Sequence, residues 1–329
     1  MTVDWQSFAD QVRSHDSFIL VSHIRPDCDA LGSELGMKEV LESIGKSVHI
    51  INAHPTPESL TFIDPSKSIQ VLGEHITADE ILADPPDCLM VLDTSAWKQL
   101  GAMGDVIRDL SCDKMVLDHH VGQDDLGATF HKNTTAEATG HLVVQAADQL
   151  GVDLTPTMSM PLYAAIATDT GWFRFPSVTP ETYRVVARLV DAGASPSNIY
   201  ADLYECDTIG RLRLRGLTLS RTQSELDGRL VYTHIDAGDF EKTGASPHDT
   251  EDVINLTLTV AGTEAAVIFV GLQSGGYKLS FRSRCKMDCS EVARKFDGGG
   301  HKAAAGASHP GPLEKAQQEV LAVVRSAMT

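Results

Sequence analysis

Three short apolar runs in the first half of the chain each end in an acidic or imidazole residue. The runs and the residues that follow them are 17–22 with His23, 88–92 with Asp93, and 114–117 with Asp118. Runs of this length and composition are typical of strands that are buried on both faces of a parallel sheet. Parallel strands share one carboxyl edge, where open α/β sheets bind their ligands. The pattern therefore predicts an α/β fold with a ligand site at that edge.

The loop after the first run carries one imidazole and two carboxylates. His23, Asp27 and Asp29 precede apolar residues at helical spacing over residues 31–44. Two carboxylates this close repel each other unless a cation lies between them, which indicates a metal site. Alternatively, Asp27 and Asp29 only cap the helix, which is a common role for aspartate. The ligand residues at the other strand ends favour the metal site, because packing does not explain three such ends at one edge.

Composition excludes several classes of protein. The chain has 329 residues, 42% of them hydrophobic, without a long apolar run, as in a soluble globular protein. We see no signal peptide or membrane anchor, and the six scattered cysteines form no C-x-x-C pair, so we expect a cytoplasmic protein with reduced thiols. A net charge of −18 argues against a broad grip on long duplex nucleic acid.

A second, smaller α/β domain is predicted toward the C-terminus, because strand and hairpin patterns take over after residue 229. The expected segments are 1–195 for the first domain, 196–226 for a helical connector and 227–329 for the second domain. Residues 278–302 are locally basic and include three glycines at 298–300. The small residues after these glycines predict a helix start, whose free N–H groups suit an anion.

These residues resemble one family closely, the DHH phosphoesterases with a DHHA1 C-terminal domain. Five ordered motifs carry the likeness: H-x-x-P-D-x-D-A-x-G-S at 23–33, Asp93, Asp-His-His at 118–120, Asp-Thr-Gly at 169–171, and G-G-G-H-x-x-A-A-G at 298–306. The two-domain form is similar to the oligoribonuclease and pAp phosphatase type. The resemblance implies a parallel-sheet DHH domain, a helical connector and a mixed α/β DHHA1 domain, with the active site in the cleft between the domains.

The resemblance also implies two divalent metal ions, Mn²⁺ as the usual pair and Mg²⁺ or Co²⁺ as alternatives. The implied ligands are His23 and Asp27 for one ion, Asp29, His119 and Asp169 for the other, and Asp93 for both. Carboxylates and imidazoles without a thiolate suit such ions. His120 is expected to act as an acid or electrostatic stabiliser, and Asp118 to orient the histidines. Cys28 is not expected to be a ligand, although its thiol could make the site sensitive to oxidation.

The expected function is hydrolysis of short oligonucleotides to mononucleotides and of pAp to AMP. The residues expected to hold the far end of the substrate are Arg282, Arg284, Gly299, Gly300 and His301. Hydrolysis of cyclic dinucleotides, pGpG or another small phosphoester is the nearer alternative, and a nucleotide-binding regulator without activity is the farther one. A homodimer is what the resemblance suggests.

Overall fold

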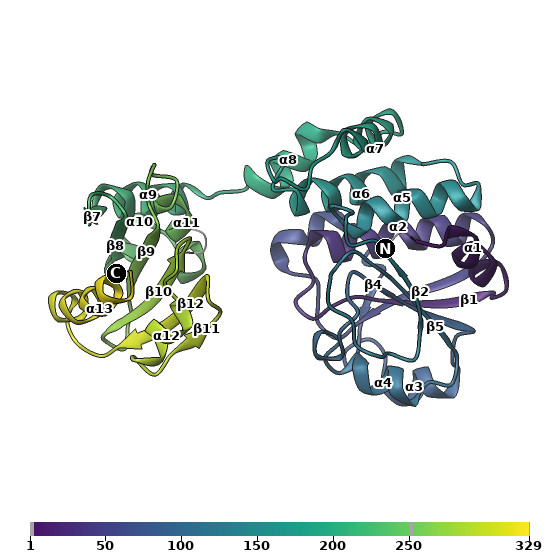
Figure 1. Cartoon of the computed structure of the whole chain (residues 1–329), viewed down its shortest axis with the longest axis horizontal. Coiled ribbons are helices and arrows are strands. Elements are labelled where there is room, and N and C mark those ends of the chain that lie inside the picture. The colour runs from purple at the N-terminus through teal and green to yellow at the C-terminus, as the bar shows by residue number, and fades with distance from the viewer. Residues whose placement is uncertain (1–2, 251–252, 329) are drawn as a thin grey trace. The chain divides into compact units, whose positions relative to one another are not determined.

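The computed structural model describes residues 3–250 and 253–328. The chain divides into two compact units, Met1–Glu205 and Cys206–Thr329, whose elements are labelled in Figure 1. Within the described residues, we find no helix that is both long and apolar enough to span a membrane.

The first unit is built on a parallel sheet of six strands in the order β3-β2-β1-β4-β5-β6. Their bounds are β1 (Ser17–Val21), β2 (Ser47–Asn52), β3 (Ile69–Val71), β4 (Cys88–Leu92), β5 (Asp113–Asp118) and β6 (Thr129–Lys132). This confirms the predicted α/β class for the first half of the chain. The strand order reverses between β1 and β4, and such a reversal leaves a crevice at the carboxyl ends of the two strands.

Helices cover both faces of this sheet, as Figure 1 shows. One face packs against α1 (Trp5–Arg13), α2 (Cys28–Ser43), α5 (Thr139–Leu150) and α6 (Pro156–Asp169), and the other against α3 (Ala78–Ala83) and α4 (Met103–Asp109). Outside α6 lie α7 (Pro180–Asp191) and α8 (Pro196–Tyr204), and the short 3-10 helices are η1 (Glu58–Ile63) and η2 (Trp97–Gln99). Alternate side chains of β1 enter the two cores, Phe18 and Leu20 on one face and Ile19 and Val21 on the other.

Gly32 lets α2 and α6 pack with their backbones in close contact. A Cβ atom at position 32 would lie 2.3 Å from the carbonyl oxygen of Pro161 on α6. Gly36, one turn further along α2, instead makes room for the side chain of Leu162. The close packing matters because α2 carries Asp29 in its first turn and α6 ends at Asp169.

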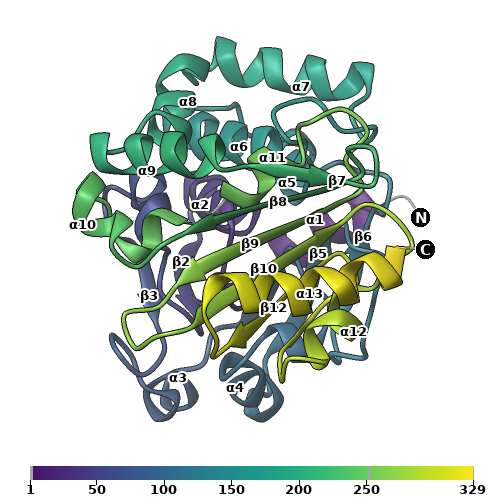
Figure 2. The same cartoon turned by 90° about the vertical axis from the view of Figure 1, so that its left-hand side faces the viewer.

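The second unit is built on a mixed sheet in the order β11-β12-β10-β9-β8-β7, in which only β8 and β9 run parallel. The strands are β7 (Gln223–Glu225), β8 (Leu230–Ile235), β9 (Ala265–Gly271), β10 (Tyr277–Ser283), β11 (Gly299–Gly300) and β12 (Ala304–His309). One face packs on α12 (Cys289–Arg294) and α13 (Leu313–Met328), and the other on α9 (Ile209–Ser220), α10 (Asp239–Thr243) and α11 (Val253–Thr257), with η3 (Pro247–Thr250) nearby. Figure 2 shows α13 across the sheet.

Two expectations about this half of the chain need comment. The helix predicted after the three glycines is wrong: Gly299 and Gly300 form β11, and the following alanines form β12. Alanine favours helices, but pairing of this segment with β10 decides its conformation. The expected connector, residues 196–226, includes α8 of the first unit and α9 of the second.

Candidate metal centre

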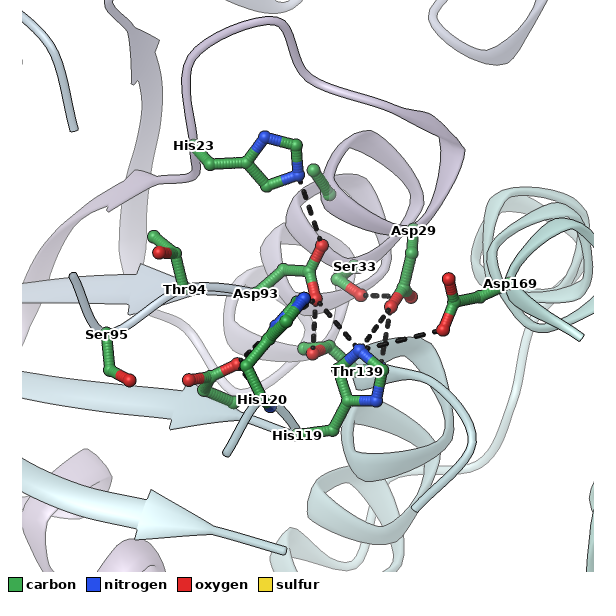
Figure 3. Close-up of polar contacts among 12 residues, drawn as sticks. His23, Asp29, Ser33, Asp93, Thr94, Ser95, His119, His120, Thr139 and Asp169 are labelled. Atoms are coloured by element: carbon green, nitrogen blue, oxygen red, sulfur yellow. Dashed lines mark hydrogen bonds and ion pairs between the residues drawn. The ribbon is translucent and has the colours of Figure 1, made fainter. Parts of the chain in front are cut away.

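Five candidate ligands from separate elements of the first unit point toward one another at the crevice between β1 and β4 (Figure 3). They are His23 after β1, Asp29 in the first turn of α2, Asp93 after β4, His119 after β5 and Asp169 at the end of α6. Each strand delivers its residue at its carboxyl end, as the sequence pattern predicts. Asp27, at the start of α2, completes the set.

Asp93 occupies the middle of the centre, and its two oxygens face different partners. Oδ2 lies 3.4 Å from Nε2 of His23, whereas Oδ1 lies 3.5 Å from Nε2 of His119. The residue is buried, and its backbone adopts a φ of 61°, in the left-handed region that aspartate tolerates better than most residues. Thr139 Oγ1 donates a hydrogen bond of 2.8 Å to Oδ1 and fixes the carboxylate.

The candidate ligand atoms form three groups of three. His23, Asp27 and Asp93 make the first group, and Asp29, His119 and Asp169 make the second; within each group, the ligand atoms lie within 4.8 Å of one another. Asp93 also forms a group with His119 and His120. Asp93 therefore belongs to the first group and contacts a member of the second.

His119 gives the clearest reason to expect a cation here. Its Nδ1 lies 3.1 Å from the Ala136 carbonyl oxygen, to which it can donate a hydrogen bond, and this leaves Nε2 as the atom that faces the centre. Nε2 lies 3.7 Å from Asp29 Oδ2, 3.5 Å from Asp93 Oδ1 and 3.6 Å from Asp169 Oδ2. These separations are too long for good hydrogen bonds. A lone pair that faces three carboxylate oxygens suits a shared metal ion.

The pKa shifts of the neighbouring groups show how concentrated the negative charge is at this centre. Burial alone would lower the pKa of His23, but the carboxylates of Asp27 and Asp93 outweigh it and raise that pKa to about 11. Burial, together with the charge of Asp93, raises the pKa of both Asp29 and Asp169. A bound cation would remove the repulsion among these carboxylates.

Asp27 does cap a helix, as the alternative interpretation of the first motif predicts, but capping is not its only contact. Asp27 Oδ1 accepts hydrogen bonds from the N–H groups of Asp29 and Ala30 at the start of α2. The same oxygen lies 3.8 Å from Nε2 of His23, so the cap also faces the centre. Asp29 instead accepts hydrogen bonds from the N–H groups of Thr139 and Gly140 at the start of α5. It thus connects α2 to α5.

Asp118 and His120 form a pair beside the candidate ligands. Oδ1 of Asp118 accepts hydrogen bonds of 2.9 Å from Nδ1 and from the backbone N–H of His120. Burial would raise the pKa of Asp118, but His120 and Lys132 lower it to about 2. The hydrogen bond that His120 donates to Asp118 raises the pKa of His120, whose side chain is half-exposed. Asp118 therefore orients His120, whereas His119 is held by the Ala136 carbonyl.

Sequence reasoning missed Thr139 and Lys132. Lys132 is buried, and its Nζ lies 2.9 Å from Asp118 Oδ2. The sequence signal for it is faint, because Lys132 does not adjoin the Asp-His-His motif in the chain and meets Asp118 only through the pairing of β6 with β5. Cys28 is 3% exposed, and burial raises the pKa of its thiol to about 12. A thiol so shielded and protonated is not a reactive one.

The residues expected to bind substrate all lie in the second unit. Arg282 lines a cavity of about 320 Å³ together with Lys278, Ser280 and aliphatic side chains of α11 and β9. Lys278 also lines a second hollow, beside Gly298 and β12. Arg284 donates a hydrogen bond of 2.9 Å to the Leu258 carbonyl.

The glycine segment begins at the second of these hollows, which Gly298 lines. Gly299 and Gly300 are exposed in β11, and His301 is exposed in the turn before β12. A Cβ atom at position 300 would lie 2.6 Å from Cα of Ala305, so only glycine fits this pairing.

Comparison with known proteins identifies relatives of both units. Residues 17–166 match the N-terminal domain of the DHH family, and residues 227–329 match the DHHA1 domain. A bifunctional oligoribonuclease and PAP phosphatase, NrnA, of Thermus thermophilus is 31% identical over 316 residues, which cover 94% of this chain and 90% of that protein. The protein of the same name from Bacillus subtilis is 28% identical over 89% of this chain and 90% of its own.

A solved structure is similar over the same length. The crystal structure of an exopolyphosphatase-related protein from Bacteroides fragilis matches with a TM-score of 0.82 and 26% identity, over 98% of this chain and 95% of that chain.

Proposed function

The chain belongs to the DHH family with a C-terminal DHHA1 domain, and on that premise we propose that it is a metal-dependent phosphoesterase. Its proposed substrates are short oligoribonucleotides, cleaved to mononucleotides, and pAp, cleaved to AMP. The names of the two bacterial relatives, which cover nearly the whole chain, support this choice.

The observation that carries the proposal is the position of Asp93 between two groups of ligands. One of its oxygens faces His23 and the other faces His119. A carboxylate with this arrangement suits a bridge between two ions. We assign His23 and Asp27 to the first ion, and Asp29, His119 and Asp169 to the second.

The donor set favours Mn²⁺, because it combines carboxylate oxygens with imidazole nitrogens and includes no thiolate. Two divalent ions, when bound, supply a water of lowered pKa and neutralise charge on the attacked phosphoryl group. The chain's own contribution is to fix the ligands. The hydrogen bonds from Thr139 to Asp93 and from His119 to the Ala136 carbonyl hold two of them in place.

His120 is the residue that we expect to meet the substrate phosphate. Its Nδ1 is bound to Asp118, so Nε2 is the atom left to face the solvent side. The raised pKa favours a protonated ring, which can hold a proton at Nε2 and stabilise negative charge on a phosphate oxygen.

The second unit would hold the rest of the substrate. Lys278 and Arg282 give the cavity its positive charge, and Ile254, Ile268 and Val270 give it an apolar wall. Positive charge beside an apolar surface suits a nucleotide, whose phosphate and base have those two characters. Gly299, Gly300 and His301 remain the proposed backbone and side-chain contacts to a second phosphate.

One assay tests the proposal. The purified chain is stripped of metal, supplied with Mn²⁺ and given 5′-labelled RNA dimers to pentamers, pAp, pyrophosphate and cyclic dinucleotides. We expect hydrolysis of the short RNA and of pAp, and its loss when the metal is removed. Failure to hydrolyse both would overturn the proposal, and cleavage of only the cyclic dinucleotides would reassign the substrate.

A pair of variants separates the centre from general damage to the fold. Asp169→Asn should abolish hydrolysis because it removes a ligand oxygen. Asp191→Asn makes the same change at an exposed end of α7 and should leave activity unchanged.

A further inference from the structure

Two buried polar residues lie behind His23, and the catalytic proposal uses neither of them. We propose that Asn52, itself held by Glu34, is a positioning residue that sets the place of His23 and therefore the affinity of the first ion. This inference rests on the proposed two-ion site.

Asn52 connects the ends of two strands to a helix. It is the last residue of β2 and is 1% exposed. Its Oδ1 accepts a hydrogen bond of 3.1 Å from the backbone N–H of Ser22, the residue directly before His23. Its Nδ2 donates a hydrogen bond of 2.8 Å to Oε2 of Glu34 on α2. The amide therefore extends the contact between β1 and β2 beyond their regular pairing, which ends at Leu20 and Ile50.

The chain on the other side of His23 is held as well. The N–H of Ile24 donates a hydrogen bond of 2.7 Å to the Gln99 carbonyl, and the N–H of Arg25 donates one of 3.3 Å to Nδ1 of His54. His23 is thus fixed between a side-chain contact on one side and two contacts on the other. On the β1 side, the side-chain hydrogen bond next to His23 is the one that Asn52 accepts from the N–H of Ser22.

Glu34 gives the second, independent observation. It is fully buried, and its Oε1 has no hydrogen-bond partner among the described residues. Burial raises the pKa of this carboxyl to about 8. An unpaired buried oxygen costs stability, so the carboxyl needs a reason to be there. Its bond to Asn52 supplies one, because it fixes the amide with Nδ2 toward the helix and Oδ1 toward Ser22.

A positioning role predicts an effect on one ion only. Residues that orient a ligand typically change metal affinity by about ten- to hundredfold when they are lost. Within the described part of the chain, the Asn52 side chain hydrogen-bonds with Ser22 and Glu34, and not with Asp29, His119 or Asp169, the ligands of the second ion. A purely structural role would instead weaken both sites together, or neither.

The test is a Mn²⁺ titration of the metal-free full chain. Calorimetry and electron paramagnetic resonance measure the binding of each ion during the titration. Asp27→Asn and Asp169→Asn serve as references that identify the first and the second ion. We expect Asn52→Ala to lower the affinity for the ion that depends on Asp27 by about ten- to hundredfold. The affinity for the other ion should stay unchanged. Asp64→Ala is the matched control, because it removes a buried side chain that accepts several hydrogen bonds elsewhere in the unit.

Glu34 provides a second pair of variants, which carries the test if Asn52→Ala fails to fold. Glu34→Gln keeps an oxygen that accepts from the amide of Asn52, so it should retain the affinity for the first ion. Glu34→Leu removes that oxygen and should lower this affinity. Equal effects of these two variants, or equal loss of both ions in Asn52→Ala, would overturn the positioning role. A wild-type chain that binds two ions but hydrolyses no substrate would overturn the proposed function and leave this test intact.

Discussion

Lys132 and Asp118 form an ion pair that is closed to solvent, with Nζ of the lysine 2.9 Å from Oδ2 of the aspartate. The two residues are register partners on the parallel strands β6 and β5. Nζ also lies 2.5 Å from both Ser95 Oγ and the Gly122 carbonyl. Lys132 therefore ties together the loops that follow Asp93 and His120.

Replacing Lys132 by methionine should strongly destabilise the first unit, because it leaves a buried carboxylate without its cation. The expected loss in the free energy of unfolding is about 3–5 kcal/mol, measured by urea denaturation. The double variant Lys132→Met with Asp118→Asn is the control, since it removes both charges and should recover much of the loss. Additive effects of the two changes would contradict a coupled pair.

The buried carboxyl of Glu34 should make stability depend on pH. Its pKa in the folded chain is about 8 and its ordinary value is 4.5, so between these values the unfolded chain has released the proton and the folded chain keeps it. Stability therefore falls as pH rises through this window, by about 1.4 kcal/mol per pH unit from this group. Glu34→Gln should remove that slope in urea unfolding of the metal-free chain. Glu58→Gln, at an exposed position, should keep it.

Two arginines of the second unit should differ in their effect on substrate binding. Arg282 lines the cavity with Lys278, so Arg282→Gln should raise KM about tenfold while kcat changes little. Arg284 donates to the Leu258 carbonyl, so Arg284→Gln should lower stability more than it raises KM. Asp93→Asn should reduce kcat to background. Steady-state kinetics with pAp and thermal unfolding measure these effects, and equal rises of KM in the two arginine variants would refute the division of roles.

Gly32→Ala should destabilise the chain, because the new methyl group would meet the Pro161 carbonyl at 2.3 Å. Pushing α2 away from α6 should lower the free energy of unfolding by about 1–3 kcal/mol. It should also lower the affinity for the second ion, because its ligands Asp29 and Asp169 lie on these two helices. Gly216→Ala is the opposite control, since position 216 is exposed on α9 with open space around it. Thermal unfolding and Mn²⁺ titration measure both variants. Gly32→Ala should lower the melting temperature and the Mn²⁺ affinity, whereas Gly216→Ala should lower neither.

The sequence is most informative where local pattern and topology agree. Apolar runs that end in His23, Asp93 and Asp118 predict buried strands, and parallel strands necessarily present such residues at one edge. The parallel sheet of the first unit is confirmed on this basis. Asp169 ends a helix and not a strand, and its place in the centre came from the family resemblance alone.

The residues that sequence reasoning missed depend on contacts between distant segments. Asn52, Lys132 and Thr139 carry no motif, and each becomes informative only when the strands and helices are assembled. The segment after Gly300 was mistaken for a helix because its alanines favour one, whereas pairing with β10 makes it a strand. Here the hydrogen bonds of β12 to both β11 and β10 outweigh local helix propensity.

The left-handed backbone of Asp93 limits which side chains evolution and protein engineers can place there. At a φ of 61°, aspartate, asparagine and glycine are tolerated, and most other residues add strain of their own. Alanine would therefore alter the loop as well as delete the carboxylate, and asparagine is the cleaner probe. Glutamate keeps the charge but pairs a longer arm with a disfavoured backbone, so the chemistry of this centre and the turn that presents it are constrained together.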